Sequence, residues 1–99
     1  MKSCFAKYIG LLIFLDMHAW VRHAGRRYAN HVTGSGMARS ALDCLRQCNV
    51  VTANCDSVNY CPSSKVCERN VHLLVTDSSQ LIVNYQWQWW IPTSMDVGY

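Results

Sequence analysis

Cysteine is the residue type in this chain whose number and spacing most directly imply chemistry. Six cysteines occur in 99 residues, and five of them cluster in the middle of the sequence, at Cys44, Cys48, Cys55, Cys61 and Cys67. In an oxidising compartment, closely spaced cysteines indicate a disulfide framework. Thiolates at structural zinc sites come in closely spaced pairs, and only Cys44 and Cys48 have such a spacing. We therefore expect disulfides and no metal site.

The N-terminus has the layout of a secretory signal peptide. Lys2 and Lys7 provide a basic start, residues 8–15 form an apolar run, and Ala19 offers a small residue for cleavage. The run is far shorter than the ~20 residues that span a bilayer, so no membrane span is expected. We predict a signal peptide over residues 1–19 and a secreted, extracellular protein. The alternative is that the apolar run is a buried helix of the domain.

Length and composition limit the rest of the chain to one small domain. With 51% hydrophobic and 15% charged residues, disorder is excluded as its main state. A formal net charge of +3 is too small and too scattered to indicate a nucleic-acid binder. The sequence places no nucleophilic Ser or Cys beside a His and an orienting acid, so we expect neither an enzyme nor a cofactor. The domain is predicted over residues 20–99, with its core at about residues 28–91.

A helix is predicted from residue 41, because both its start and its apolar face are visible in the sequence. Ser40 is a suitable N-cap, and Asp43 follows three residues later, as in a capping box. Apolar residues recur at helical spacing, at Ala41, Cys44, Leu45 and Cys48. The β-branched residues 50–52 favour the end of the helix after about three turns.

Strands are predicted on both sides of this helix. The residues before it, 20–30, are basic and extended, and residues 33–36, with two glycines, have the composition of a loop. The patterns after the helix predict strands over residues 55–60, 65–69, 71–75, 81–85 and 86–89. The first two form a hairpin around a turn at residues 62–64. Together these elements predict an α+β fold in which one helix packs on an antiparallel sheet.

The alternation of residues also assigns side chains to the two faces of the sheet. In the hairpin, Val58 and Asn59 lie on opposite faces. In the last strand, Trp87 and Trp89 share a face and are expected to pack under the helix. Trp90 points the other way and is the aromatic residue expected to be exposed.

Helix geometry selects two disulfides. Cys48 lies near the helix end and is closest along the chain to Cys55, at the start of the first hairpin strand. Cys44, one turn earlier on the same face, then reaches Cys67 on the returning strand. We predict the nested bridges Cys44–Cys67 and Cys48–Cys55, each contributing about 2–4 kcal/mol to the stability of a small domain.

These residues resemble the core of a PAN/Apple domain. The pattern is Cys44-x₃-Cys48-x₆-Cys55, continued by Asp-Ser-Val-Asn-Tyr and later by Lys65-Val66-Cys67-Glu68. The resemblance is strongest over residues 39–70 and extends weakly over most of the mature chain. It implies the same nested disulfide pairing and an extracellular, non-catalytic module that binds proteins or carbohydrates, including sulfated glycans. The outer cysteine pair of Apple-type members is missing, which resembles the shorter PAN variant.

Five residues are candidates for ligand contact. They are Arg26, Arg27, Arg39, Arg46 and Trp90. Guanidinium groups bind sulfate and carboxylate by bidentate hydrogen bonds, and aromatic rings are enriched at binding surfaces. We therefore predict a recognition module for an extracellular protein or a glycan. The alternative for the arginines is a solvated charged face without a ligand.

Cys61 supports a second hypothesis about function. It lies at the hairpin turn without an evident partner. It is expected to be a free thiol, an interchain bridge, or a partner of Cys4 if the signal is retained. An interchain bridge would make a covalent homodimer, and the protein would then be a structural or matrix protein that assembles through Cys61.

Overall fold

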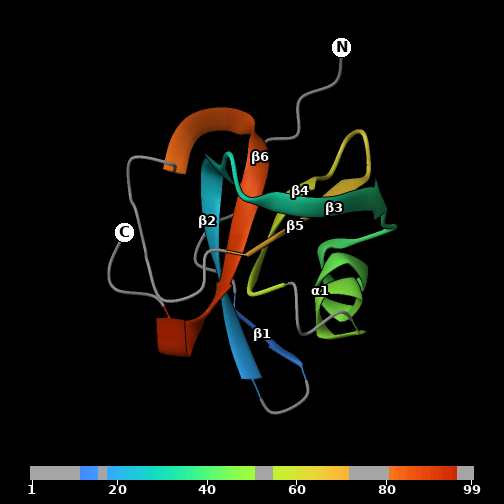
Figure 1. The fold of residues 1–99 in the computed structure, drawn as a ribbon, viewed down its shortest axis with the longest axis vertical. Coiled ribbons are helices and arrows are strands. Elements are labelled where there is room, and N and C mark those ends of the chain that lie inside the picture. Colours follow the sequence, from blue (N-terminus) through green and yellow to red (C-terminus); the bar gives the residue numbers. More distant parts are fainter. Residues whose placement is uncertain (1–11, 16–17, 51–54, 72–80, 96–99) are drawn as a thin grey trace.

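The strands of the computed structural model form one antiparallel sheet, with a helix packed on one face (Figure 1). The structure describes residues 12–15, 18–50, 55–71 and 81–95. Within these residues the elements are β1 (Leu12–Leu15), β2 (His18–Tyr28), β3 (Val32–Met37), α1 (Ala41–Val50), β4 (Ser57–Cys61), β5 (Val66–Asn70), β6 (Leu81–Pro92) and the 3₁₀ turn η3 (Thr93–Met95). The sheet order is β1-β2-β6-β4-β5-β3, and every pairing is antiparallel. The predicted α+β fold is confirmed.

Helix α1 begins where the capping pattern predicts. The backbone N–H of Asp43 donates to Ser40 Oγ at 3.1 Å, and the backbone N–H of Arg39 donates to Asp43 Oδ2 at 3.0 Å. The first bond satisfies a donor that the opening turn of a helix leaves without an intrahelical partner. The second bond holds the incoming chain against the helix start. Ser40 is therefore the N-cap of α1.

We expect Ser40→Ala to lower the free energy of unfolding by about 1 kcal/mol, because it removes the oxygen that caps the helix. Urea denaturation followed by circular dichroism measures the change. The exposed turn residue Ser64 provides a matched control, and Ser64→Ala should change the free energy by less than about 0.5 kcal/mol. Equal effects of the two substitutions would contradict the role of Ser40 as the cap.

The apolar side chains form two cores, one on each face of the sheet. The larger core lies between α1 and the sheet and contains Trp20, Ala38, Cys44, Leu45, Cys48, Cys55, Val58, Tyr60, Cys67 and Trp90. The smaller core lies on the opposite face and contains Tyr28, Trp89 and Ile91. Because both faces are covered, polar residues of the central strands are buried as well.

Trp90 lies in the larger core, so the prediction that it is exposed is wrong. It is 1% exposed, and it pairs with Val58 on the sheet face that α1 covers. Trp89 pairs with Asn59 and packs on the opposite face, and not under the helix as expected. The alternation along β6 was predicted correctly. The face that the helix covers depends on the register between β6 and β4, which a single strand's sequence does not show.

Both predicted disulfides are confirmed. Cys44 is bonded to Cys67 and Cys48 to Cys55, with Cα–Cα distances of 5.5 Å and 5.3 Å. The first bridge joins α1 to β5, and the second joins α1 to the chain just before β4. The helix is thereby fixed covalently to the hairpin.

Cys61, at the end of β4, is also disulfide-bonded, and none of the described cysteines is free. This corrects the expectation of a free thiol. Cys4, the partner considered for it from the sequence, lies outside the described residues. Covalent assembly requires a thiol that is open to a second chain, and Cys61 offers none in the chain that retains residues 1–19. The matrix role and the covalent homodimer through Cys61 stay predictions.

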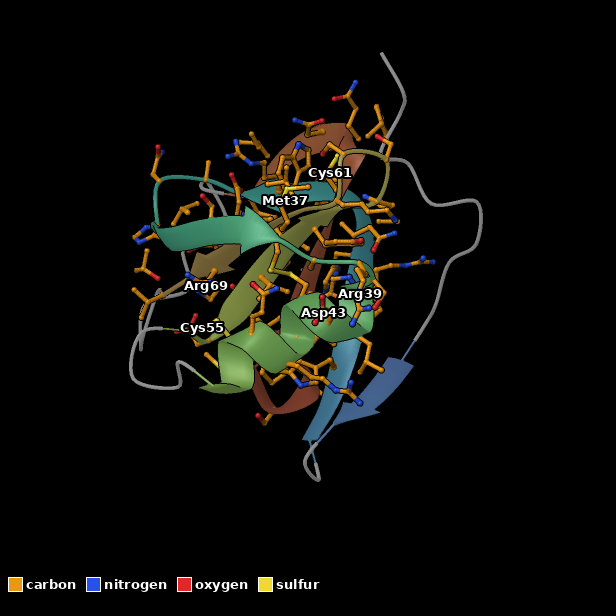
Figure 2. All side chains as sticks on the ribbon, turned by 90° about the vertical axis from the view of Figure 1, so that its right-hand side faces the viewer. Met37, Arg39, Asp43, Cys55, Cys61 and Arg69 are labelled. Carbon is orange, nitrogen blue, oxygen red and sulfur yellow. A yellow bond between two sulfur atoms is a disulfide. The ribbon has the colours of Figure 1, made fainter. Side chains whose placement is uncertain are left out.

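Residues 33–36 belong to strand β3, and their prediction as a loop is wrong. Gly34 pairs with Arg69 of β5, and a Cβ atom at Gly34 would collide with the Arg69 guanidinium. Arg69 Nη1 donates to Gln47 Oε1 of α1 at 3.3 Å, so its side chain fills the space between strand and helix (Figure 2). The glycine at this position makes room for a side chain and does not mark a turn.

The remaining strands lie close to their predicted positions. The patterns over residues 81–85 and 86–89 form the single strand β6. The strand expected over residues 71–75 falls almost entirely outside the described residues. Part of the predicted signal peptide forms β1, which pairs with the start of β2 at one edge of the sheet; the signal peptide itself stays a prediction. Across the described ranges, no helix is long and apolar enough to cross a membrane.

Candidate functional site

Arg27 on β2 is held inside the fold by an ion pair. Its Nε and Nη2 donate to the two carboxylate oxygens of Glu68 on β5, at 2.9 and 2.7 Å. Its guanidinium also lies 4.9 Å from the centroid of the Trp87 ring. The hydrogen bonds to Glu68 raise the pKa of Arg27 above its ordinary value. Because this pair engages two of the donors that an anionic ligand would need, Arg27 has a structural role, and its ligand role stays a prediction.

The other predicted arginines lie on different parts of the fold. Arg26 is on β2, where its Nη1 donates to the Gly25 carbonyl at 3.1 Å. Arg46 is exposed on α1. Arg39, just before α1, lines an open hollow of about 380 Å³, and neither Arg26 nor Arg46 lines it. The structure therefore does not gather the predicted arginines into one site.

An open hollow lies beside the start of α1, and we call it the α1 hollow. It is lined by Met37, Ala38, Arg39, Asp43 and Lys65. Met37 is 66% exposed, and Arg39 and Lys65 are also exposed. Lys65 Nζ donates to the Arg39 carbonyl at 3.4 Å, so the two cationic residues border the same opening.

Lys65 is the site residue that the sequence did not reveal. It was expected to start the returning strand of the hairpin, but it lies at the end of the turn with φ of 60°. Its closeness to Arg39 depends on the pairing of β3 with β5. Because the glycines of β3 have the composition of a loop, no sequence pattern connected the two cations.

Hydrogen bonds from three directions hold the backbone of the α1 hollow. The Ala38 N–H donates to the Lys65 carbonyl at 2.9 Å, and the Tyr60 hydroxyl donates to the Ala38 carbonyl at 2.9 Å. On the helix side, Gln47 Nε2 donates to the Met37 carbonyl at 2.8 Å. Each bond ties the segment between β3 and α1 to a different element. The cationic side chains are therefore mounted on a fixed backbone.

The charges of the α1 hollow favour an anion. Arg39 and Lys65 contribute two positive charges and Asp43 one negative charge, which leaves +1 at neutral pH. Asp43 Oδ2 already accepts the Arg39 N–H at the helix start, so this carboxylate is partly neutralised. A guanidinium and an ammonium beside an exposed thioether can bind a carboxylate or a sulfate together with an adjoining apolar group. Within the described parts of the chain, no three side chains of His, Cys, Asp or Glu gather to hold a metal ion.

The phenol of Tyr60 lies beneath the α1 hollow and should titrate late. Burial raises its pKa above the ordinary value of about 10, and the Asp43 carboxylate adds to the rise. The neutral phenol is therefore favoured in the folded state. Its contribution to stability is fully present below about pH 10 and is lost as the pH rises through the folded pKa.

We expect the ultraviolet phenolate signal of the folded protein to contain one component that appears above pH 10 and is absent from Tyr60→Phe. An alkaline absorbance titration measures it. The same titration of Tyr85→Phe, which removes an exposed tyrosine, should retain the late component. Loss of the late component from Tyr85→Phe, or its survival in Tyr60→Phe, would contradict the assignment.

A family model described as the PAN domain matches residues 16–87 of the chain. The match covers more than half of the sequence and includes β2, β3, α1, β4, β5 and the first half of β6. It is broader than the region of strongest resemblance found from the cysteine pattern. No curated protein and no solved structure gives a significant match.

Proposed function

The chain belongs to the PAN domain family, and on that basis we propose that it is a secreted recognition module that binds an anionic group of an extracellular protein or glycan in the α1 hollow. PAN domains are known for interactions with proteins and carbohydrates and are generally non-catalytic. A PAN domain with disulfides is typical of extracellular proteins. The disulfides of this chain agree with an oxidising compartment.

The observation that carries the proposal is the closeness of Arg39 and Lys65 at one opening. A guanidinium fork and an ammonium group offer several donors to a carboxylate or a sulfate. Both residues are exposed, and among the described residues neither forms an ion pair such as that of Arg27 with Glu68. The Cys44–Cys67 bridge fixes α1, which follows Arg39 in the chain, relative to β5, which follows Lys65.

Secretion is proposed with cleavage after Ala19, which would leave a mature domain over residues 20–99. This cleavage removes Cys4, so in the mature domain Cys61 would have no cysteine of the same chain left to bond. Among the described residues, β1 lies at the edge of the sheet and pairs only with β2. Its removal would leave the pairing of Trp20–Tyr28 with β6 in place. Intact-mass measurement of the protein secreted by expressing cells should show Trp20 as the first residue. A secreted protein that retains residues before Trp20 would contradict this cleavage site.

Binding of a heparin-derived oligosaccharide, measured by surface plasmon resonance, tests the α1 hollow. We expect Arg39→Gln with Lys65→Gln to weaken binding at least about tenfold, because charge-assisted hydrogen bonds contribute about 1.5–3 kcal/mol each. The matched control is Arg26→Gln with Arg46→Gln, which removes the same charge outside the hollow. The control should weaken binding by less than about threefold at physiological salt, where distant charges are screened.

Equal weakening by the two double variants would show that only net charge is sensed, and would overturn the assignment of the α1 hollow. Failure of the unchanged protein to bind sulfated glycan would remove this glycan class and leave a carboxylate on a protein partner as the anionic ligand. The same pair of double variants can then be compared on acidic peptides.

A further inference from the structure

Strand β3 forms one edge of the sheet. It pairs with β5 on one side, and no other described strand pairs with it on the other side. Five of its six residues are exposed. An edge strand presents backbone N–H and C=O groups that can pair with another extended chain. Figure 2 looks directly onto this strand beside α1.

The hydrogen-bond pattern shows which groups of β3 face outward. The Ala38 N–H donates to the Lys65 carbonyl, one residue beyond the end of the ladder between β3 and β5. Hydrogen-bonded pairs alternate in an antiparallel ladder, so Gly36 and Gly34 also direct their backbone groups toward β5. Ser35 and Met37 therefore direct theirs toward the open edge. The Met37 carbonyl accepts from Gln47, which leaves the Met37 N–H and both backbone groups of Ser35 for an incoming strand.

Edge strands are usually protected by charged residues, by proline, by a bulge that twists the edge away, or by a covering helix or loop. Helix α1 reaches this edge through Gln47, which donates to the Met37 carbonyl. The sequence of β3 is VTGSGM, with neither a charge nor a proline. Its register shift lies between Val32 and Gly34, before the outward groups of Ser35 and Met37. The part of the edge nearest the α1 hollow is therefore regular and neutral.

We propose that an extended segment of a partner protein adds to β3 as an antiparallel strand and places an acidic side chain in the α1 hollow. This inference rests on the proposed function, because the acidic group occupies the site formed by Arg39 and Lys65. β3 runs toward the hollow and ends at Met37, which lines it. An antiparallel segment therefore brings its N-terminal end to the hollow, so the acidic residue precedes the residues that pair with Ser35. Backbone pairing supplies affinity, and the acidic residue fixes the register.

Charge complementarity favours a different protein over a second copy of this chain. If two copies paired through β3 in antiparallel fashion, the residues brought toward Arg39 and Lys65 would come from the start of the other β3. That part of the sequence, residues 28–33, reads Tyr-Ala-Asn-His-Val-Thr and contains no acidic residue. A second copy would therefore leave both cations without an anionic partner.

A synthetic peptide with two acidic residues followed by alternating Thr and Val residues serves as the probe. Isothermal titration calorimetry with the full protein should show binding that weakens about tenfold in Ser35→Pro, since the lost N–H removes a hydrogen bond and proline hinders close pairing. The control Ser35→Thr keeps the N–H and should bind within about threefold of the unchanged protein. Ser35→Pro leaves the ladder to β5 in place, because the Ser35 N–H points away from it.

Methylation of the peptide nitrogens tests the pairing without altering the protein. In an added strand, only every second residue directs its N–H toward β3. Methylation of those nitrogens should abolish binding, whereas methylation of the nitrogens of the intervening residues should be tolerated. A peptide with its acidic residues moved to the C-terminal end should bind about tenfold more weakly. Equal effects of the two methylation patterns would overturn strand addition.

The outcomes separate this inference from the proposed function. If Ser35→Pro binds the peptide as well as the unchanged protein while Arg39→Gln with Lys65→Gln does not, the hollow stands and strand addition is wrong. If Ser35→Pro abolishes binding and the double variant has no effect, strand addition occurs without the hollow and the acidic anchor is wrong. Light scattering tests whether the protein forms a dimer. A dimer that the Ser35→Pro substitution dissociates would show that a second copy of the chain pairs with β3, and it would overturn the proposal of a partner segment.

Discussion

Replacing Cys44 and Cys67 together by alanine is expected to lower the free energy of unfolding by about 3.5 kcal/mol. Replacing Cys48 and Cys55 together by alanine is expected to lower it by about 2.5 kcal/mol. The difference follows from chain entropy, because the bridges span 23 and 7 residues and the longer loop constrains the unfolded chain more. Cys44 and Cys67 are also completely buried, so their removal leaves space in the larger core. A domain of this size has a total stability of only about 5–15 kcal/mol.

Urea denaturation of the two double variants and the unchanged protein, under non-reducing conditions, measures both values. The variant without Cys48 and Cys55 is the matched control, since it also replaces two buried cysteines by alanine. A smaller loss from removing Cys44–Cys67 than from removing Cys48–Cys55 would contradict the order expected from loop length. A double variant as stable as the unchanged protein would show that the bridge does not hold α1 to the sheet.

Asn59→Leu is expected to lower the free energy of unfolding by about 3–5 kcal/mol. Asn59 is completely buried on β4. Its Oδ1 accepts the Tyr28 N–H at 2.8 Å, and its Nδ2 donates to the Tyr28 carbonyl at 2.9 Å. Nδ2 also lies 3.1 Å from Glu68 Oε1 and 3.2 Å from Asn70 Oδ1. Leucine has a similar size but leaves these buried polar groups without partners, which costs about 1–3 kcal/mol for each group.

The matched control is Asn84→Leu on β6, where the amide oxygen accepts an exposed backbone N–H of Gln86. We expect this control to change the free energy of unfolding by less than about 0.5 kcal/mol. The same chemical denaturation measures both substitutions. A comparable, small effect at the two positions would contradict the role of Asn59 as the hydrogen-bonding link between β2, β4 and β5.

The covalent frame of the fold could be predicted from the sequence because it depends on local spacing. The capping pair Ser40 and Asp43 marks the start of α1, and helical spacing places Cys44 and Cys48 on one face. Neighbouring strands then leave few geometric choices for the bridges. These features involve residues close in sequence, where propensity and periodicity are informative.

Burial of the second face of the sheet could not be predicted in the same way. The alternation in the hairpin correctly separates Val58 from Asn59, but polar residues such as Asn59 suggest a solvent-exposed face. The long strands β2 and β6 bring Tyr28 and Trp89 onto that face and bury it. This arrangement is fixed by pairings between segments far apart in the sequence, which single-strand patterns do not contain.

The candidate site was predicted only in part for the same reason. Arg39 was identified by its type, but Lys65 joins it only through the pairing of β3 with β5. Arg27 looked equally available in the sequence, yet Glu68 on a distant strand occupies it. Residue type therefore indicated the chemistry, and tertiary contacts decided which cations are open to a ligand.

The most direct test of the α1 hollow as the binding site is a map of amide chemical shifts during titration of the protein with a heparin-derived oligosaccharide. We predict that the largest shifts fall on residues 37–43 and on Lys65, with small shifts at Arg26 and its partner Val83. Shifts concentrated on Arg26 and Val83, with none around the α1 hollow, would contradict the assignment of the binding site to Arg39 and Lys65.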